Sequence, residues 1–553
     1  MIDQINLLKK KQYIVLILFY LLVFFSVVLI FKDFGIQIEE KFHRMNGLYW
    51  LHYIAQVFDL DKIFSITDSK MILVNDYTMS KVTDMNKYGI IFDMPLAFIE
   101  IIFGIQKMEN IYHSKHILSF FTFLVSSFFF FKILIKRFKK FFISFIGTVL
   151  FITTPRIFGD SFFYNDVLFL SFFNIALYFF LEILENSNTK NLIYFALFSA
   201  IAFNLRVFGI MLPVTFFLIL IIKSFNNKKI YEYLKFYSLY LITFFGLVII
   251  FSPYLWSSPF KNFIEIFTLL RETGIITFRI LFNNEFVSNQ NVPASYLITW
   301  ILISTPIFTL IFFSFGYISF FFRFLNRFTS ISEKNTFNDL WRGNKEQKDF
   351  IIFFLLTAYY FIFALLDAPL HNGWRLVYFL NIFIIYFSVY SIDRLFLFVK
   401  KSNLKKYFLS LTVIISIIYN ITYLIVYHPY QSYYFNELIS NNKRNTFEID
   451  YHGLGAKEFF LKLTSDNKGK QVNVGVASFT PLHRGLEGID RKSRKTINLV
   501  GQNYKNADFI YKNNISEVNF RLNKKYKIPN NFDKVYELKI NGTKIYEIYK
   551  KIK

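Results

Sequence analysis

Apolar residues in this sequence form long blocks, and short polar segments separate the blocks. The first block, Tyr13–Phe31, contains no charged residue. A helix needs about 20 apolar residues to cross the hydrocarbon core of a bilayer, so blocks of this length predict membrane-spanning helices. The pattern predicts eleven of them, at residues 13–31, 116–135, 141–154, 167–184, 192–205, 207–222, 236–255, 296–320, 350–366, 376–392 and 407–427.

One further apolar stretch is too short to span a bilayer. The segment PLAFIEIIFGIQ at residues 95–106 has about half the required length. If it were a span, the alternation of the chain would place the basic cluster at 136–140 outside, against the charge bias of membrane proteins. We therefore expect this segment to form an amphipathic helix at the outer membrane interface.

The charges lie in short clusters between the apolar blocks. The net charge is +24, and basic clusters occur at residues 9–11, 136–140, 223–229, 323–327 and 400–406. Lys and Arg concentrate in cytoplasmic loops, so this distribution predicts a cytoplasmic N-terminus and argues against nucleic acid as a partner. The loops 32–115, 155–166, 256–295 and 367–375 and the tail from about residue 428 then lie on the outer face. The sequence has no cysteine, which excludes disulfides and thiolate metal sites.

The C-terminal tail has the sequence character of a soluble unit. KQVNVGVAS at residues 470–478 predicts a strand, and KVYELKINGTKIYEIY at 534–549 predicts a hairpin that turns at Asn541-Gly542. We therefore predict two units. Residues 1–427 form an all-α polytopic membrane domain with interfacial helices in its first outer loop, 32–115. Residues 428–553 form a small extracytoplasmic α/β domain.

Charged residues gather at the outer ends of the predicted spans. Taken singly, such arginines can be interfacial anchors, a histidine can be solvated and an aspartate can cap a turn. Here, however, they come from four connections that are distant in sequence, which favours a functional site. The set comprises Glu39, Glu40, His43, Arg44, Arg156, Asp160, Asp166, Arg206, Asp367, His371 and Arg375.

This combination of acids and arginines suits a particular chemistry. A lipid-phosphate-linked sugar has its phosphate at headgroup depth and its prenyl tail in the bilayer. Arginines at that boundary can bind the phosphate through bidentate, charge-assisted bonds, and a carboxylate can take the proton from an acceptor hydroxyl or amine. The sequence has no Walker loop or other glycine-rich phosphate motif, which argues against a nucleotide donor.

Short motifs follow one another in an order typical of a known family. They are IEEKFHRMNG at 38–47, KYGIIFDMPLAF at 87–98, PRIFGDSFFYND at 155–166, HNGWRLVYF at 371–379, and HPYQSYYFNEL and EIDYHGLGAKEF within 428–459. In these motifs the chain resembles the membrane glycosyltransferases of the GT-C fold, specifically family 39, which includes the dolichyl-phosphate-mannose protein mannosyltransferases and bacterial relatives. It departs from the family pattern at Glu39, where relatives usually have Asp, and at Leu376, where they usually have His.

The resemblance implies roles for individual residues. Glu39 is the implied catalytic base, with Glu40 beside it as an alternate base or orienting residue and Asp166 as a third acid. The implied donor-phosphate ligands are Arg206, Arg375 and Arg156, and the further substrate-cleft candidates are His43, Asp160 and His371. The resemblance implies neither a metal ion nor a cofactor.

The implied function is that of an inverting hexosyl or pentosyl transferase. It would move a sugar from a polyprenyl-phosphate donor to a protein, lipid A or glycan acceptor at the periplasmic face of a bacterial inner membrane. The sequence leaves the sugar and the acceptor open. Two other functions remain: a transporter or flippase of lipid-linked precursors, which would favour charges or broken helices near the midplane, and an O-antigen ligase or polymerase that uses a diphosphate-linked donor.

Overall fold

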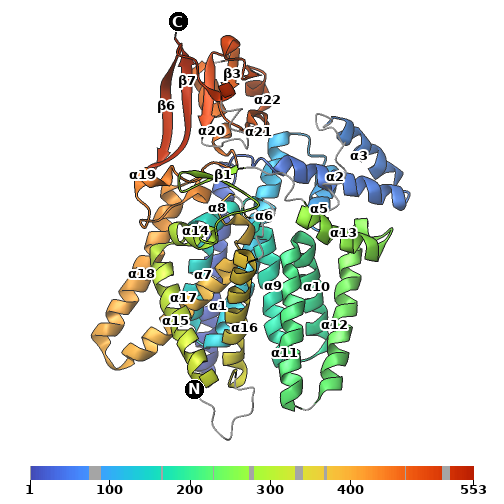
Figure 1. Ribbon diagram of the computed structural model, residues 1–553, viewed down its shortest axis with the longest axis vertical. Helices are drawn as coiled ribbons and strands as arrows, with labels where there is room; N and C mark the ends of the chain where they lie inside the picture. Colours follow the sequence, from blue (N-terminus) through green and yellow to red (C-terminus); the bar gives the residue numbers. More distant parts are fainter. Residues whose placement is uncertain are drawn as a thin grey trace.

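The computed structural model describes residues 2–73, 89–163, 166–227, 229–272, 279–329, 340–365, 370, 372–467, 469–513 and 524–552. Its long helices form a bundle, with the N-terminus at one end and a C-terminal sheet at the other (Figure 1). The helices of the first half are α1 (Ile2–Ile30), α2 (Glu40–Val57), α3 (Asp61–Leu73), α5 (Asp93–Ile102), α6 (Met108–Phe138), α7 (Phe141–Ile152), α8 (Pro155–Asp160), α9 (Asp166–Glu185), α10 (Thr189–Leu205), the 3-10 helix η2 (Val207–Ile210), α11 (Met211–Asn227), α12 (Ile230–Ile250), the 3-10 helix η3 (Pro253–Leu255) and α13 (Pro259–Glu272).

The second half contains further helices and all the strands that the structure describes. Its helices are α14 (Tyr296–Ser304), α15 (Ile307–Thr329), α16 (Gly343–Leu365), the 3-10 helix η5 (Arg375–Val377), α17 (Leu380–Phe398), η6 (Val399–Lys401), α18 (Asn403–Val426), η7 (Gln431–Tyr433), α19 (Asn441–Arg444), α20 (Gly455–Asn467), α21 (Leu482–Glu487), α22 (Arg491–Arg494) and η8 (Tyr504–Asn506). Its strands are β1 (Arg279–Phe282), β2 (Glu285–Ser288), β3 (Val472–Val476), β4 (Ile497–Gly501), β5 (Phe509–Asn513), β6 (Phe532–Ile540) and β7 (Thr543–Lys551).

Among the described residues, nine helices are long and apolar enough to cross a membrane, by length and composition. Two shorter apolar helices, α7 and α10, complete a set that coincides in position with the eleven predicted spans. The most enclosed of the nine are α9 and α17, with 83% and 67% of their apolar windows buried. The prediction of an all-α polytopic membrane protein with a small C-terminal α/β unit is confirmed.

The predicted span at 296–320 is divided in the structure. It consists of α14 and α15, and the break falls at Thr305, whose backbone is extended (φ −97°, ψ 140°), immediately before Pro306. A proline has no backbone N–H and disfavours the helical conformation of the residue before it. Hydropathy alone does not register this break, because both sides of it are apolar.

Four helices lie across the end of the bundle that carries the sheet: α2, α3, α5 and α13 (Figure 1). The predicted short helix at 95–106 is α5, although its position at a membrane interface stays a prediction. It packs closely on α2, because Gly47 leaves no side chain between them; a Cβ there would lie 2.2 Å from the carbonyl oxygen of Asp93. A buried bidentate ion pair between Arg44 and Glu100 fixes the two helices together, at 2.9 and 2.7 Å.

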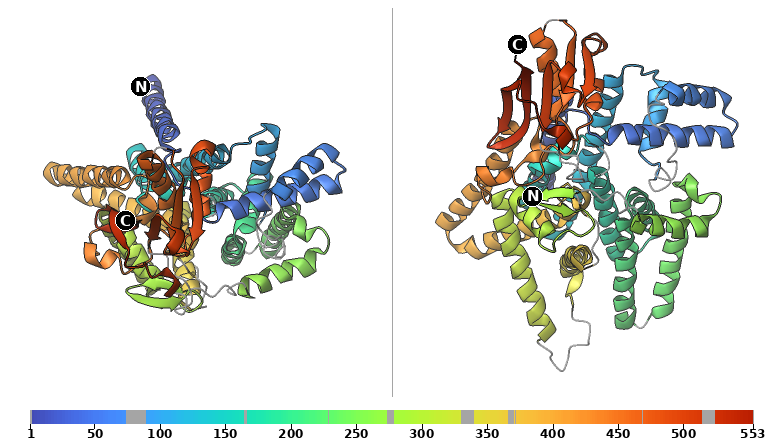
Figure 2. Two further views of the ribbon diagram at one scale, coloured as in Figure 1. Left: turned by 90° about the horizontal axis from the view of Figure 1, so that it is seen from above. Right: turned by 45° about the horizontal axis from the view of Figure 1, so that its top comes forward.

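The C-terminal sheet has five strands in the order β4-β3-β5-β7-β6. Strand β3 is parallel to β4 and β5, whereas β7 is antiparallel to β5 and β6. The predicted hairpin is confirmed: Asn541 and Gly542 both have positive φ, as a two-residue hairpin turn requires. The sheet lies over the centre of the bundle end, while α2 and α3 extend to one side and α18 to the other (Figure 2). A domain boundary at residue 428 stays a prediction.

Ion pairs tie the helices together at the opposite end of the bundle. Asp349 of α16 is fully buried and accepts two hydrogen bonds from Arg137 of α6, each 2.6 Å long. It also lies 3.2 Å from Nη2 of Arg323 on α15. Two of the predicted cytoplasmic basic clusters therefore bind the same buried acid at this end: the cluster at 136–140 through Arg137 and the cluster at 323–327 through Arg323.

A short antiparallel hairpin, β1 and β2, packs on the start of the tail beside the 372–375 turn. The backbone N–H of Glu448 donates to the carbonyl of Leu281, and the buried Glu448 carboxylate accepts a hydrogen bond of 2.9 Å from Asn372. Burial raises the pKa of Glu448 to about 7, against the opposing effects of the Asn372 bond and the Arg375 charge. The Glu448 carboxyl therefore joins the hairpin, the turn and the tail, and below pH 7 it does so mainly in its neutral form.

The raised pKa of Glu448 predicts a pH-dependent stability. Because the ordinary pKa is 4.5, the folded protein retains a proton that the unfolded chain has already lost, and stability falls as the pH rises from about 4.5 through 7. Glu448→Gln remains neutral and keeps an acceptor for Asn372. We expect it to abolish a pH-dependent loss of roughly 3 kcal/mol between pH 5 and 8.

Thermal unfolding of the detergent-solubilised protein, followed by tryptophan fluorescence across that pH range, measures this effect. Asp466→Asn, which alters an exposed acid of α20, is the matched control. Parallel profiles for the wild type and Glu448→Gln would contradict the prediction.

Candidate functional site

Two acids and two arginines from four separate elements meet at the end of the bundle that carries the sheet. Glu39 precedes the first turn of α2, and Asp166 is the first residue of α9. Arg206 occupies the extended residue between α10 and η2, and Arg375 begins η5 in front of α17. We call these four residues the charged cluster. The two most enclosed helices, α9 and α17, thus present Asp166 and Arg375 at the same end.

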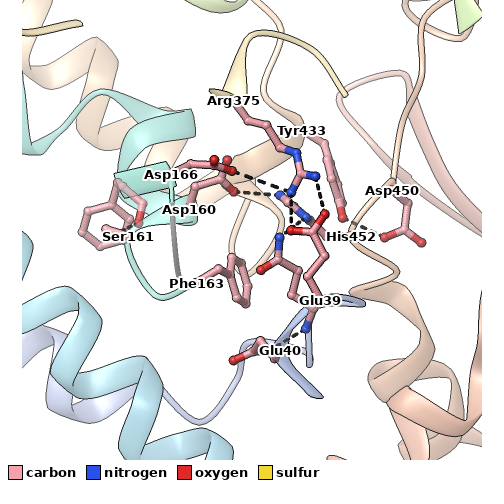
Figure 3. A network of polar contacts seen from close by, with 12 residues as sticks. Glu39, Glu40, Asp160, Ser161, Phe163, Asp166, Arg375, Tyr433, Asp450 and His452 are labelled. Atoms are coloured by element: carbon pink, nitrogen blue, oxygen red, sulfur yellow. Dashed lines mark hydrogen bonds and ion pairs between the residues drawn. The ribbon is translucent and has the colours of Figure 1, made fainter. Parts of the chain in front are cut away.

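Arg375 binds Glu39 in a bidentate ion pair. Its Nη2 and Nη1 atoms lie 2.5 Å and 3.1 Å from the two carboxylate oxygens of Glu39, and Nη1 lies 3.6 Å from Oδ2 of Asp166 (Figure 3). Burial alone would lower the pKa of Arg375, but Glu39 and Asp166 together raise it above its ordinary value. The Arg375 side chain is 3% exposed, whereas the Glu39 side chain is 40% exposed. Glu39 therefore joins a buried cation to the surface.

Asp166 holds the second cation. Its Oδ1 atom is ion-paired with Nη2 of Arg206, whose side chain is partly exposed. The carboxylate lies in the first turn of α9, where the positive end of the helix dipole stabilises an anion. The buried Asp166 carboxylate therefore lies between Arg206 and Arg375, with one oxygen toward each guanidinium.

The structure separates the adjacent acids Glu39 and Glu40. Glu40 is buried and points away from Arg375 (Figure 3). Its two oxygens lie 3.0 Å from Nε2 of His116 and 2.7 Å from the backbone nitrogen of Gln37, which donates to it. Glu40 thus closes the turn that precedes α2 and attaches it to α6.

His43 is directed into the packing between α2 and α5. Its Nδ1 atom lies 3.2 Å from Oδ2 of Asp93, and Asn46 donates a 2.6 Å hydrogen bond to the same oxygen. The structure therefore does not bring His43 to the charged cluster. His371, another predicted cleft residue, and Asp367 lie outside the described residues.

Arg156 lies behind the cluster and is almost fully buried, at 1% exposed. Its guanidinium carbon lies 5.0 Å from the ring centroids of both Trp300 and Phe435, and its Nε donates 2.9 Å to the carbonyl of Tyr434. A cation beside aromatic rings is stabilised by their quadrupoles. In this arrangement Arg156 holds α8 against the tail.

Asp160, at the end of α8, is also buried, and His452 of the tail lies beside it at 3.4 Å. The sequence analysis assigned no role to His452, Gln37, His116, Asp93 or Glu448. His452 and Glu448 do lie within the quoted motif EIDYHGLGAKEF, which was the available signal. Nothing in the local sequence links position 37 to position 452.

The site contains two arginines close to one exposed carboxylate. Such a site can bind a tetrahedral dianion and place a carboxylate next to it. Within the described part of the chain, no group of three or more His, Cys, Asp or Glu side chains is arranged to hold a metal ion.

Comparison with known proteins gives a partial sequence match and a structural match. Residues 94–256 match the family model described as dolichyl-phosphate-mannose-protein mannosyltransferase. No curated protein matches the sequence. Among solved structures, the crystal structure of ArnT from Cupriavidus metallidurans bound to undecaprenyl phosphate matches with a TM-score of 0.38 and 9% identity, over 84% of this chain and 88% of that chain. The family match includes Asp166 and Arg206, and it confirms that this chain resembles the family 39 membrane glycosyltransferases of the GT-C type.

Proposed function

We propose that this protein transfers a sugar from a polyprenyl-phosphate donor to an acceptor at the outer face of a bacterial inner membrane. The observation that carries the proposal is the charged cluster: Arg206 and Arg375 flank the buried Asp166, and Glu39 adjoins them with its side chain partly in solvent. The cluster lies at the end of the bundle opposite the N-terminus and the basic clusters. The prenyl tail of a donor would lie in the bilayer while its phosphate reached this end of the helices.

Arg375 and Arg206 are the proposed donor-phosphate ligands. Both guanidiniums are held in place by carboxylates, so little conformational freedom would be lost when an anion binds. During transfer the phosphate leaves with an additional negative charge, and two fixed cations stabilise that charge as it develops. Arg156 is proposed to act indirectly, because its buried guanidinium packs against Trp300 and Phe435 and its Nε donates to the Tyr434 carbonyl.

Glu39 is the proposed general base. The acceptor oxygen or nitrogen attacks the anomeric carbon, and the bond between that carbon and the phosphate oxygen breaks. The electron pair of that bond stays on the polyprenyl phosphate, while the acceptor proton passes to the Glu39 carboxylate and then to solvent. Attack opposite the leaving phosphate inverts the anomeric configuration.

The ion pair between Glu39 and Arg375 gives this reaction an order. While two nitrogens of Arg375 bind both carboxylate oxygens of Glu39, the carboxylate is occupied by this ion pair. A bound phosphate competes for the same guanidinium and releases Glu39 toward the acceptor. Glu39 would therefore become available as a base only when the donor is bound. Without a bound donor, Glu39 would stay paired with Arg375 and would not take a proton from water or an acceptor.

A transfer assay distinguishes this proposal from the other two functions. Purified protein in nanodiscs receives undecaprenyl-phosphate-linked mannose, glucose or aminopentose, with membranes from cells that lack the protein as the acceptor. Release of undecaprenyl phosphate supports a transferase. In sealed proteoliposomes, movement of the labelled lipid across the membrane without that release would support a transporter. In a parallel reaction supplied with a diphosphate-linked glycan, consumption of that donor alone would support a ligase or polymerase.

Replacement of the proposed base tests its role directly. Glu39→Gln removes the proton acceptor, so we expect kcat to fall by roughly 10²–10⁴-fold. Because the neutral amide no longer competes for Arg375, binding of undecaprenyl phosphate, measured by native mass spectrometry, is expected to stay equal or become tighter. The matched control is Glu232→Gln, an exposed acid at the start of α12. Full activity, or weaker phosphate binding in parallel with the loss of kcat, would contradict the assignment.

Arg206 provides a second test, of the phosphate site. Arg206→Lys keeps the charge but replaces the planar fork of donors with a single ammonium group. We expect the KM for the donor to rise roughly tenfold, corresponding to about 1.4 kcal/mol, with a smaller change in kcat. Arg394→Lys, at the far end of α17, is the control. An unchanged KM would show that Arg206 does not bind the donor.

A further inference from the structure

The turn that carries Glu39 is held by the C-terminal tail. The backbone N–H of Ile38 donates to the carbonyl of His452 at 3.1 Å, and Nζ of Lys457 donates to the carbonyl of Phe34 at 3.0 Å. Gly35 faces Leu454 so closely that a Cβ at residue 35 would lie 2.5 Å from the Leu454 carbonyl oxygen. Residues 34–38, which we call the Glu39 turn, thus pack directly on residues 452–457.

Within this contact, the His452 side chain contacts Gln37 with one ring nitrogen and Asp160 with the other. Nδ1 of His452 lies 2.7 Å from the amide nitrogen of Gln37, and Nε2 lies 3.4 Å from Oδ1 of Asp160. The Gln37 amide donates to Nδ1, so the ring proton is on Nε2 and faces the Asp160 carboxylate. Gln37, His452 and Asp160 are all buried, and they connect the Glu39 turn to α8 through the tail. Figure 3 shows His452 next to Asp160.

The sheet fixes the tail on the other side of His452. Asp450 is buried, has a positive φ of 56°, and accepts hydrogen bonds from Tyr433 at 2.8 Å, Tyr511 at 3.1 Å and Asn513 at 2.9 Å. Two of these donors belong to β5. A backbone conformation that is unusual for an aspartate is thus held by three hydrogen bonds, and the position of His452 follows from the position of the sheet.

We propose that His452 is a positioning residue for Glu39, acting through Gln37, so that the C-terminal sheet sets the position of the base relative to Arg375 and Asp166. The inference rests on the proposed function in that Glu39 is taken as the base. Rate in such a reaction is sensitive to small displacements: a 1 Å shift of a reacting group can cost about 10²-fold. In this proposal the tail positions the base Glu39, in addition to any contact that the tail makes with an acceptor.

Matched variants of His452 separate its two contacts. Asn places an acceptor near the position of Nδ1 and can keep the Gln37 contact, whereas Gln places its polar end near Nε2 and can keep the Asp160 contact. We expect His452→Ala and His452→Gln to lower kcat 10–100-fold with an unchanged donor KM, and His452→Asn to stay within about threefold of the wild type. Asn498→Ala, which removes an exposed side chain of β4 that pairs with Asn473 inside the sheet, is the control.

A double-mutant cycle tests whether Gln37 transmits the effect. If His452 acts through Gln37, the double variant Gln37→Ala/His452→Ala loses no more than about threefold beyond the worse single variant. The proposal would be overturned if the fold losses in kcat of the two single variants multiplied in the double variant. It would also be overturned by an unchanged kcat in His452→Ala, or by an equal loss of kcat in His452→Asn and His452→Ala.

A measurement independent of activity completes the test. The chain has no cysteine, so Glu39→Cys provides a single site for a nitroxide spin label. We expect His452→Ala to increase the mobility of that label in the EPR spectrum and Asn498→Ala, in β4, to leave it unchanged. An unchanged spectrum in His452→Ala would overturn the positioning role even in an active enzyme. If His452→Ala mobilises the label but the unlabelled wild-type protein releases no undecaprenyl phosphate, the proposed function is contradicted and the positioning of residue 39 is supported.

Discussion

The bidentate ion pair between Arg375 and Glu39 is the interaction on which the site depends. It joins residues 336 positions apart and brings the connection after α1 to the connection before α17. A buried guanidinium without a partner would be costly, so the carboxylates of Glu39 and Asp166 are needed to hold Arg375 at the end of a helix bundle. The same pair leaves one carboxylate edge partly exposed, which is the feature that a base for an external acceptor requires.

The surrounding structure serves to fix this pair. Asp166 begins α9, and Arg375 lies in η5 just before α17, so both residues are attached to the two most enclosed helices of the bundle. Glu39 lies on a turn instead, and turns are mobile unless other parts of the protein hold them. Glu40 fastens that turn to His116 on one side, and the tail fastens it through Gln37 and His452 on the other. Asp166 and Arg375 are therefore held by the helix bundle, whereas Glu39 is held by the polar contacts of its turn.

The sequence predicted the parts of the structure that depend on local patterns. Long apolar blocks located the spans, because membrane helices need continuous hydrophobic length, and Asn541-Gly542 located the tail hairpin, because few residues adopt positive φ. The convergence of Glu39, Asp166, Arg206 and Arg375 was also predicted, from their common position at helix ends. The directions of the side chains were not: Glu40 faces His116, His43 faces Asp93 and Arg156 packs against Trp300 and Phe435. These orientations follow from tertiary packing, and the contact between Gln37 and His452 spans 415 positions without any local signal.

The central claim is that the donor phosphate replaces the Glu39 carboxylate on Arg375. A cryo-electron microscopy structure of the protein in nanodiscs with undecaprenyl phosphate tests it most directly. The phosphate is expected between Arg206 and Arg375, with the Glu39 carboxylate moved away from the Arg375 guanidinium and open to solvent. A phosphate bound elsewhere, with the ion pair between Glu39 and Arg375 still closed, would contradict the claim.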